Sequence, residues 1–94
     1  MFLHIGGNVV IPAKNIIAIF DIDSTTVSKD TRDFLKVAEE EGFVESISDD
    51  LPKSFIITEV DKKSKIYLSP ISSTTLLKRS LYIKSISKSK TLFD

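Results

Sequence analysis

Apolar residues along much of this chain alternate with polar ones, which is the two-residue period of β-strands. The alternation, together with short runs of β-branched residues, predicts strands over residues 2–5, 9–11, 16–22, 43–47, 54–60 and 65–69. The sequence Gly6-Gly7-Asn8 favours a hairpin turn between the first two strands. The run IIAIFDI (16–22) is β-branched and aromatic, and it is therefore predicted to be a buried central strand.

Two segments have the period of a helix instead. One helix is predicted from Ser28 or Asp30 to about Glu41, with Gly42 at the C-cap position that favours a positive φ. Its apolar stripe consists of Phe34, Leu35, Val37 and Ala38. A second, short helix is predicted over residues 73–80.

These elements predict an α+β fold, with a small, mainly antiparallel β-sheet, one longer helix and one short helix. The 94 residues are enough for one domain, which we place at residues 1–80. Residues 81–94 form a basic tail rich in Ser and Lys, which we expect to be partly disordered. A core this small favours oligomerisation, because contacts between copies bury further apolar surface.

The composition excludes several kinds of chemistry. There is no Cys, so disulfides and thiol catalysis are excluded, and His4 is the single histidine. No apolar run approaches the roughly 20 residues that span a bilayer. The start MFLHIGGN does not have the pattern of a secretory signal. We therefore expect a cytoplasmic protein with no membrane partner and no cofactor.

Charge is distributed unevenly, although the formal net charge is zero. Residues 1–52 contain four basic and ten acidic residues, whereas residues 53–90 contain nine basic and two acidic ones. A basic half is typical of a surface that binds a polyanion, but it is also typical of ordinary solvated lysines.

The stretch IFDIDSTT (19–26) resembles the first motif of the haloacid-dehalogenase phosphatases, with Asp21 and Asp23 in the places of nucleophile and general acid. Such an enzyme also needs a later acidic pair to hold magnesium. After residue 61 the chain has only Asp94 as an acidic residue. We therefore interpret the stretch as the end of a strand that turns towards a helix, and we expect no enzymatic activity.

Three segments resemble the RemA/RemB family of small bacterial extracellular-matrix regulators, and the RemB branch is the nearer. They are FLHIGGNVVIPAKNIIAIFDI at the start, KSFIITEV in the middle and KIYLSPISSTTLLKR near the end. The resemblance covers about residues 2–80. It implies a cytoplasmic DNA-binding regulator of biofilm-matrix genes that assembles into a ring with a basic rim.

The resemblance also implies where double-stranded DNA would be contacted. Family arginines before the third and fifth predicted strands correspond to Lys14-Asn15 and to the turn that contains Lys53. This chain therefore has a lysine and an amide where the family has arginines, and only Arg makes a planar two-pronged contact with phosphate. Lys62, Lys63 and Arg79 are further candidate nucleic-acid-binding residues, from their charge and predicted positions.

Each candidate also has a structural interpretation. Lysines on a hairpin protect strand edges from aggregation, and Arg79 suits the negative end of a helix. Two functions from different classes therefore stay open. The first is a DNA-binding regulator that works as an oligomeric ring through phosphate contacts. The alternative is an oligomeric protein-interaction module that has lost direct DNA binding. A continuous basic surface that joins Lys14, Lys53 and residues 62–65 would favour the first.

Overall fold

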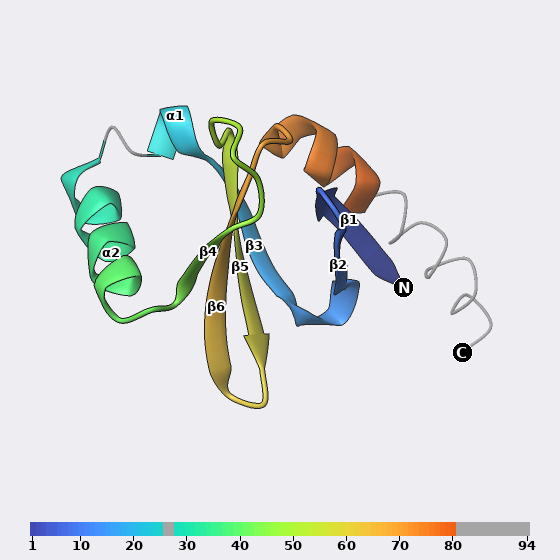
Figure 1. Ribbon diagram of the computed structural model, residues 1–94, viewed down its shortest axis with the longest axis horizontal. Coiled ribbons are helices and arrows are strands. Elements are labelled where there is room, and N and C mark those ends of the chain that lie inside the picture. Colours follow the sequence, from blue (N-terminus) through green and yellow to red (C-terminus); the bar gives the residue numbers. More distant parts are fainter. Residues whose placement is uncertain (26–27, 81–94) are drawn as a thin grey trace.

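The structure is a computed structural model that describes residues 1–25 and 28–80 (Figure 1). Its elements follow the chain in the order β1 (Phe2–Gly6), β2 (Val9–Pro12), the 3-10 turn η1 (Ala13–Asn15), β3 (Ile16–Asp21), α1 (Ile22–Thr25), α2 (Lys29–Glu40), β4 (Val44–Ser46), β5 (Ser54–Val60) and β6 (Lys63–Ser69). Residues 73–80 are helical and are called the C-terminal helix below. The expectation of a disordered tail concerns residues 81–94, which lie outside the described residues.

The predicted α+β class is confirmed, but the strands form two sheets instead of one. Strands β1 and β2 make a separate antiparallel hairpin, and the other four strands are ordered β3-β5-β6-β4. Three of the pairings among the described strands are antiparallel, and β4 runs parallel to β6. A parallel strand needs a long crossover, and the segment that contains α2 carries the chain from β3 across to the far edge of the sheet.

The prediction of a central strand over 16–22 is wrong, because β3 lies at the edge of the four-stranded sheet and β5 takes a central position. Strand β3 also contains a bulge between Ile16 and Ala18, which leaves Ile17 with 59% of its surface exposed. The strand ends at Asp21, and the helical turn α1 begins at Ile22. The interpretation of IFDIDSTT as a strand end is therefore correct in its geometry.

The four-stranded sheet is covered on both faces (Figure 1). One core cluster lies between the sheet and α2, and it contains Ala38, Phe55 and Ile66. The opposite cluster joins the sheet to the β1–β2 hairpin and the C-terminal helix, through Leu3, Ile5, Ile11, Ile56 and Leu76. Successive residues of a strand point to opposite faces, so Phe55 and Ile56 on β5 belong to different clusters.

The two predicted helices match their predicted ranges, whereas the short helix α1 was not predicted. Helix α2 follows Ser28, which has no side-chain capping hydrogen bond, and it ends before Gly42, whose φ is +80°. In the turn that precedes the C-terminal helix, the Ser72 hydroxyl accepts a hydrogen bond from the backbone N–H of Thr75, so Ser72 caps this helix. Among the described residues, no helix has the length and apolar character needed to cross a membrane.

Candidate nucleic-acid interface

The β5–β6 hairpin projects from the rest of the described chain (Figure 1). Its turn contains Lys62 and is followed directly by Lys63. Its turn is shorter than the predicted four-residue loop, because β6 begins at Lys63 and only Asp61 and Lys62 connect the strands. Both turn residues have positive φ, +52° and +65°, as in the two-residue turns that match the twist of a hairpin. Lys62 and Lys63 are exposed there.

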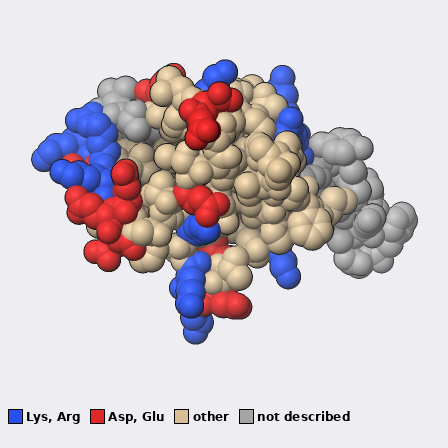
Figure 2. All heavy atoms as spheres, in the orientation of Figure 1, with Lys and Arg blue, Asp and Glu red and all other residues tan. Residues whose placement is uncertain are grey.

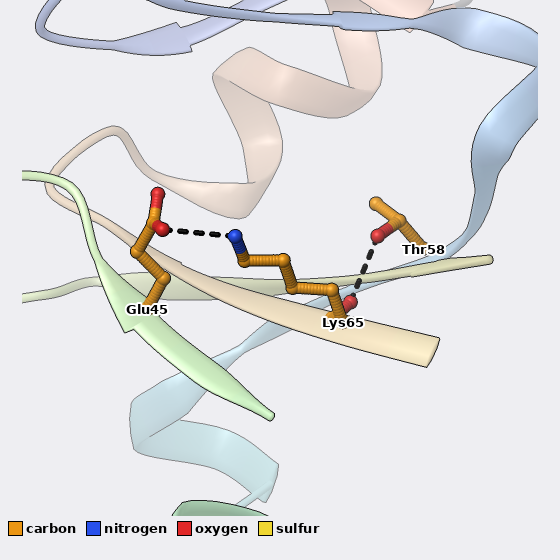
Figure 3. Close-up of polar contacts among 3 residues, drawn as sticks. All are labelled: Glu45, Thr58 and Lys65. Atoms are coloured by element: carbon orange, nitrogen blue, oxygen red, sulfur yellow. Dashed lines mark hydrogen bonds and ion pairs between the residues drawn. The ribbon is translucent and has the colours of Figure 1, made fainter. Parts of the chain in front are cut away.

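Lys65 follows on the same strand but is engaged within the protein (Figure 3). Its Nζ lies 2.9 Å from Oε1 of Glu45 on β4 and 5.2 Å from the centre of the Tyr67 ring. The backbone carbonyl of Lys65 accepts a 2.9 Å hydrogen bond from the buried hydroxyl of Thr58. The hydrogen bond to Glu45 raises the pKa of Lys65 above its ordinary value of 10.5, against an opposing effect of burial and with further support from Tyr67.

This shift predicts how the stability of the protein depends on alkaline pH. A group whose pKa is raised on folding stabilises the fold below its unfolded pKa, and the contribution disappears as the pH rises through its folded pKa. Glu45→Gln should therefore lower the free energy of unfolding slightly at neutral pH, with a difference from wild type that shrinks above pH 10.5. Because the pair is about half exposed, we expect a difference of less than about 1 kcal/mol. Urea unfolding at several pH values measures it, and a difference that grows with pH would contradict it.

Lys14 and Asn15 lie in η1, immediately before β3. Because Ile16 pairs with Thr58 near the end of β5, η1 is at the same end of the sheet as the hairpin tip. Lys14 is exposed, whereas Asn15 is only partly exposed. The structure therefore places two predicted sites, Lys14 and Lys62-Lys63, towards one end of the sheet.

Lys53 lies at the opposite end. It precedes β5, whose first residue Ser54 pairs with Asp21 at the end of β3. The backbone of Lys53 is held at both polar groups, since its N–H donates to Ser69 at 2.8 Å and its carbonyl accepts from Ile22 at 3.0 Å. The seven residues of β5 separate Lys53 from the hairpin tip by roughly 20 Å. One subunit therefore does not bring Lys53 and the hairpin lysines together.

Arg79 is exposed on the C-terminal helix, but its guanidinium has a contact within the fold. Nη1 donates a 2.9 Å hydrogen bond to the backbone carbonyl of His4 on β1. The contact joins residues 75 positions apart in the chain and helps to hold the C-terminal helix on the β1–β2 hairpin. Arg79 thus has a structural role, and its predicted role in binding stays a prediction.

Basic side chains form separate groups on the face drawn in Figure 2, with acidic side chains beside several of them. The continuous basic surface that would favour DNA binding is not present on that face of one subunit. Among the candidate binding residues, Lys62 and Lys63 are consecutive in the chain and both exposed, at the hairpin tip.

Two apolar surfaces accompany these lysines. A groove at the edge of β3 is lined by Met1, Phe2, Ile17 and Leu77 among others, and each of these four side chains is 46–65% exposed. On the other side of the sheet, Phe34 and Val37 of α2 are 49% and 55% exposed. Phe34 also lines a shallow hollow with Phe20. Large apolar side chains gathered in this way are typical of surfaces that contact another protein.

The described chain is thus a small α+β protein with a lysine-tipped hairpin and two apolar surfaces. It belongs to the RemA-like family, since the family described as "Extracellular matrix regulatory protein A-like" matches residues 2–80. Over 86 residues it is 34% identical to "Extracellular matrix regulatory protein B" of Bacillus subtilis (strain 168). That alignment covers 92% of this chain and 98% of the relative. The family expected from the three sequence segments is confirmed.

Proposed function

We propose that this protein is a non-enzymatic regulator of extracellular-matrix genes that binds double-stranded DNA as an oligomeric ring. The name of the Bacillus subtilis relative, "Extracellular matrix regulatory protein B", supports the regulatory role. The observation that supports DNA contact most directly is the projecting hairpin, with Lys62 and Lys63 exposed at its tip. Each ammonium group neutralises a phosphate and releases a condensed counterion.

The conformation of Lys62 adds support. Its φ of +65° is in the left-handed region, which costs an ordinary residue about 1–2 kcal/mol and which favours Gly or Asn. A lysine at such a position is displayed outwards by the turn, at a cost to stability. Strained positions of this kind are often found at functional sites.

Repetition around an oligomer compensates for the small number of lysines in one hairpin. The groove with Ile17 and the α2 surface with Phe34 and Val37 contain different residues and lie on opposite sides of the sheet. A contact between two different surfaces is heterologous, and copies joined in this way form a ring when the rotation closes. Weak phosphate contacts from successive hairpins then act together on one duplex.

Fluorescence anisotropy with a duplex of roughly 60 base pairs, titrated across salt concentrations, tests this function. Assembled protein should bind with a log–log salt slope of several units, because each neutralised phosphate contributes about 0.9. Lys62→Ala combined with Lys63→Ala should flatten that slope, and Lys14→Ala should reduce it less. Absence of binding at about 50 mM salt, where phosphate contacts are strong, would contradict direct DNA binding.

Lys62→Asn separates the structural and functional effects of this position. Asn tolerates the left-handed conformation and has no charge, so we expect the free energy of unfolding to rise by up to about 1 kcal/mol while DNA affinity falls. Urea unfolding and the anisotropy titration measure the two effects on the same preparation. Lys36→Asn on α2, an exposed lysine away from the hairpin, is the matched control and should leave DNA affinity nearly unchanged. Equal affinity of the Lys62→Asn variant and wild type would argue against a phosphate contact at the tip.

A second function, an oligomeric protein-interaction module without DNA contact, is favoured by the scattered bases. Lys53 lies far from the hairpin, Lys65 is paired with Glu45, and the Arg79 guanidinium contacts His4. This alternative predicts the same assembly through the apolar surfaces but no salt-dependent binding to the duplex.

A further inference from the structure

We propose that Glu45 masks an additional phosphate-binding position on this protein, formed by Lys65 and the hollow around it. The inference rests on the DNA-binding function proposed above. It concerns a phosphate contact in addition to those of the exposed lysines Lys62 and Lys63. Glu45 weakens this additional contact. The sequence pattern does not predict this pair, because the proximity of the two side chains arises from the parallel pairing of β4 with β6.

The hollow lies along one side of the lysine-tipped hairpin, next to its turn. Phe43, Lys63, Lys65 and Tyr67 are among the residues that line it, together with the turn residues Asp61 and Lys62. Lys63 and Lys65 are two residues apart on β6, so they point to the same face of the sheet. A phosphate group that enters from the tip therefore meets two ammonium groups on one face, next to apolar and aromatic walls.

Glu45 forms an ion pair with the ammonium group of Lys65, which lies farther from the hairpin tip than that of Lys63. Its Oε1 is 2.9 Å from Lys65 Nζ, and the side chains of the pair are 47% and 45% exposed, so both reach the solvent from which DNA approaches. In the bound pair the carboxylate neutralises Lys65 and also presents negative charge to an incoming phosphate. Ion pairs with this exposure are weak enough for solvent and other ions to compete with them. Glu45 consequently acts as a removable mask whose contribution to the stability of the fold is small.

The mask gives a direct prediction of increased binding. Glu45→Gln keeps the shape of the side chain, removes its charge and leaves Lys65 without a carboxylate partner. We expect affinity for the 60-base-pair duplex to rise roughly 3–10-fold at low salt, and the salt slope to steepen by about 0.9 for each subunit that engages a phosphate. Lys65→Gln alone should change wild-type binding little, because Lys65 is already neutralised.

Glu59→Gln is the matched control. Glu59 is exposed on the adjacent strand β5, and it lies on the opposite face from Lys65 because it pairs with Ser64. No ion pair joins Glu59 to another described residue. Both substitutions remove one negative charge from the same part of the molecule, but only Glu45→Gln releases a lysine. The double variant Glu45→Gln/Lys65→Gln has the net charge of wild type and no released lysine, so it should lose the gain and return to about the affinity of wild type.

The possible outcomes separate this inference from the proposed function. If wild type binds and Glu45→Gln binds more tightly than Glu59→Gln, the masked position is supported. If the two glutamine variants are equally strengthened, the effect is net charge alone and the inference is overturned while DNA binding stands. If wild type binds and Glu45→Gln is unchanged, only the inference fails. If wild type, Glu45→Gln and Glu59→Gln all fail to bind, both ideas are overturned.

Discussion

Leu76→Ala should lower the free energy of unfolding by about 2–5 kcal/mol, the largest stability effect that we expect from one substitution outside the sheet. Leu76 is fully buried in the cluster that joins the C-terminal helix to the β1–β2 hairpin and the sheet. Truncation removes its packing and leaves a cavity against Ile5 and Ile56. A domain of this size has about 5–15 kcal/mol of stability in total, so the loss is a large part of it.

Leu77→Ala on the same helix is the control, because Leu77 is 46% exposed. We expect less than about 1 kcal/mol for it. Urea unfolding should show a clearly lower midpoint for Leu76→Ala with a similar slope. Leu77 lines the groove proposed as a subunit contact, so both variants are compared at several matched protein concentrations. Equal loss in the two variants at low concentration would mean that Leu76 does not hold the helix in place.

The local part of this fold was predictable from the sequence. The period of apolar residues located the strands and helices, and Gly42 marked the end of α2. The position of β3 was not predictable in this way. Its apolar run is typical of a strand buried on both faces, but a strand can have two covered faces and still have a free edge. The order β3-β5-β6-β4 depends on long-range pairing, which the period of one strand does not contain.

The candidate site was predictable only where it depends on neighbours in the sequence. Lys62 and Lys63 were found because a turn between two strands is a local signal. The pairing of Lys65 with Glu45 was missed, since it requires β4 to lie beside β6. The contact from Arg79 to His4 likewise joins distant segments. For Lys65, the sequence contains one signal of an acidic partner. The segment FVESI alternates apolar and polar residues, as a half-exposed strand does, and Glu45 is at one of its polar positions.

Ile17→Asp should dissociate the proposed oligomer into smaller species. Ile17 is 59% exposed at the bulge of β3 and lines the apolar groove, so a charge there has little effect on the monomer but is costly once the groove is covered. Val10→Asp is the matched control, because Val10 is 51% exposed on β2 and does not line the groove. Analytical ultracentrifugation should show a reduced mass for Ile17→Asp and a wild-type mass for Val10→Asp.

Mixing two defective variants tests the geometry of the contact. Phe34→Asp places a charge on the α2 surface and leaves the groove unchanged. Ile17→Asp places a charge in the groove and leaves the α2 surface unchanged. If the groove of one copy packs on α2 of the next, each variant alone is monomeric, but the mixture forms a heterodimer with one intact contact and no larger species. An isologous contact between two grooves would leave Phe34→Asp fully assembled. A steep salt dependence of DNA binding requires the hairpins of many subunits in one assembly. The heterodimer has only two hairpins, so its log–log salt slope should be much smaller than that of wild type.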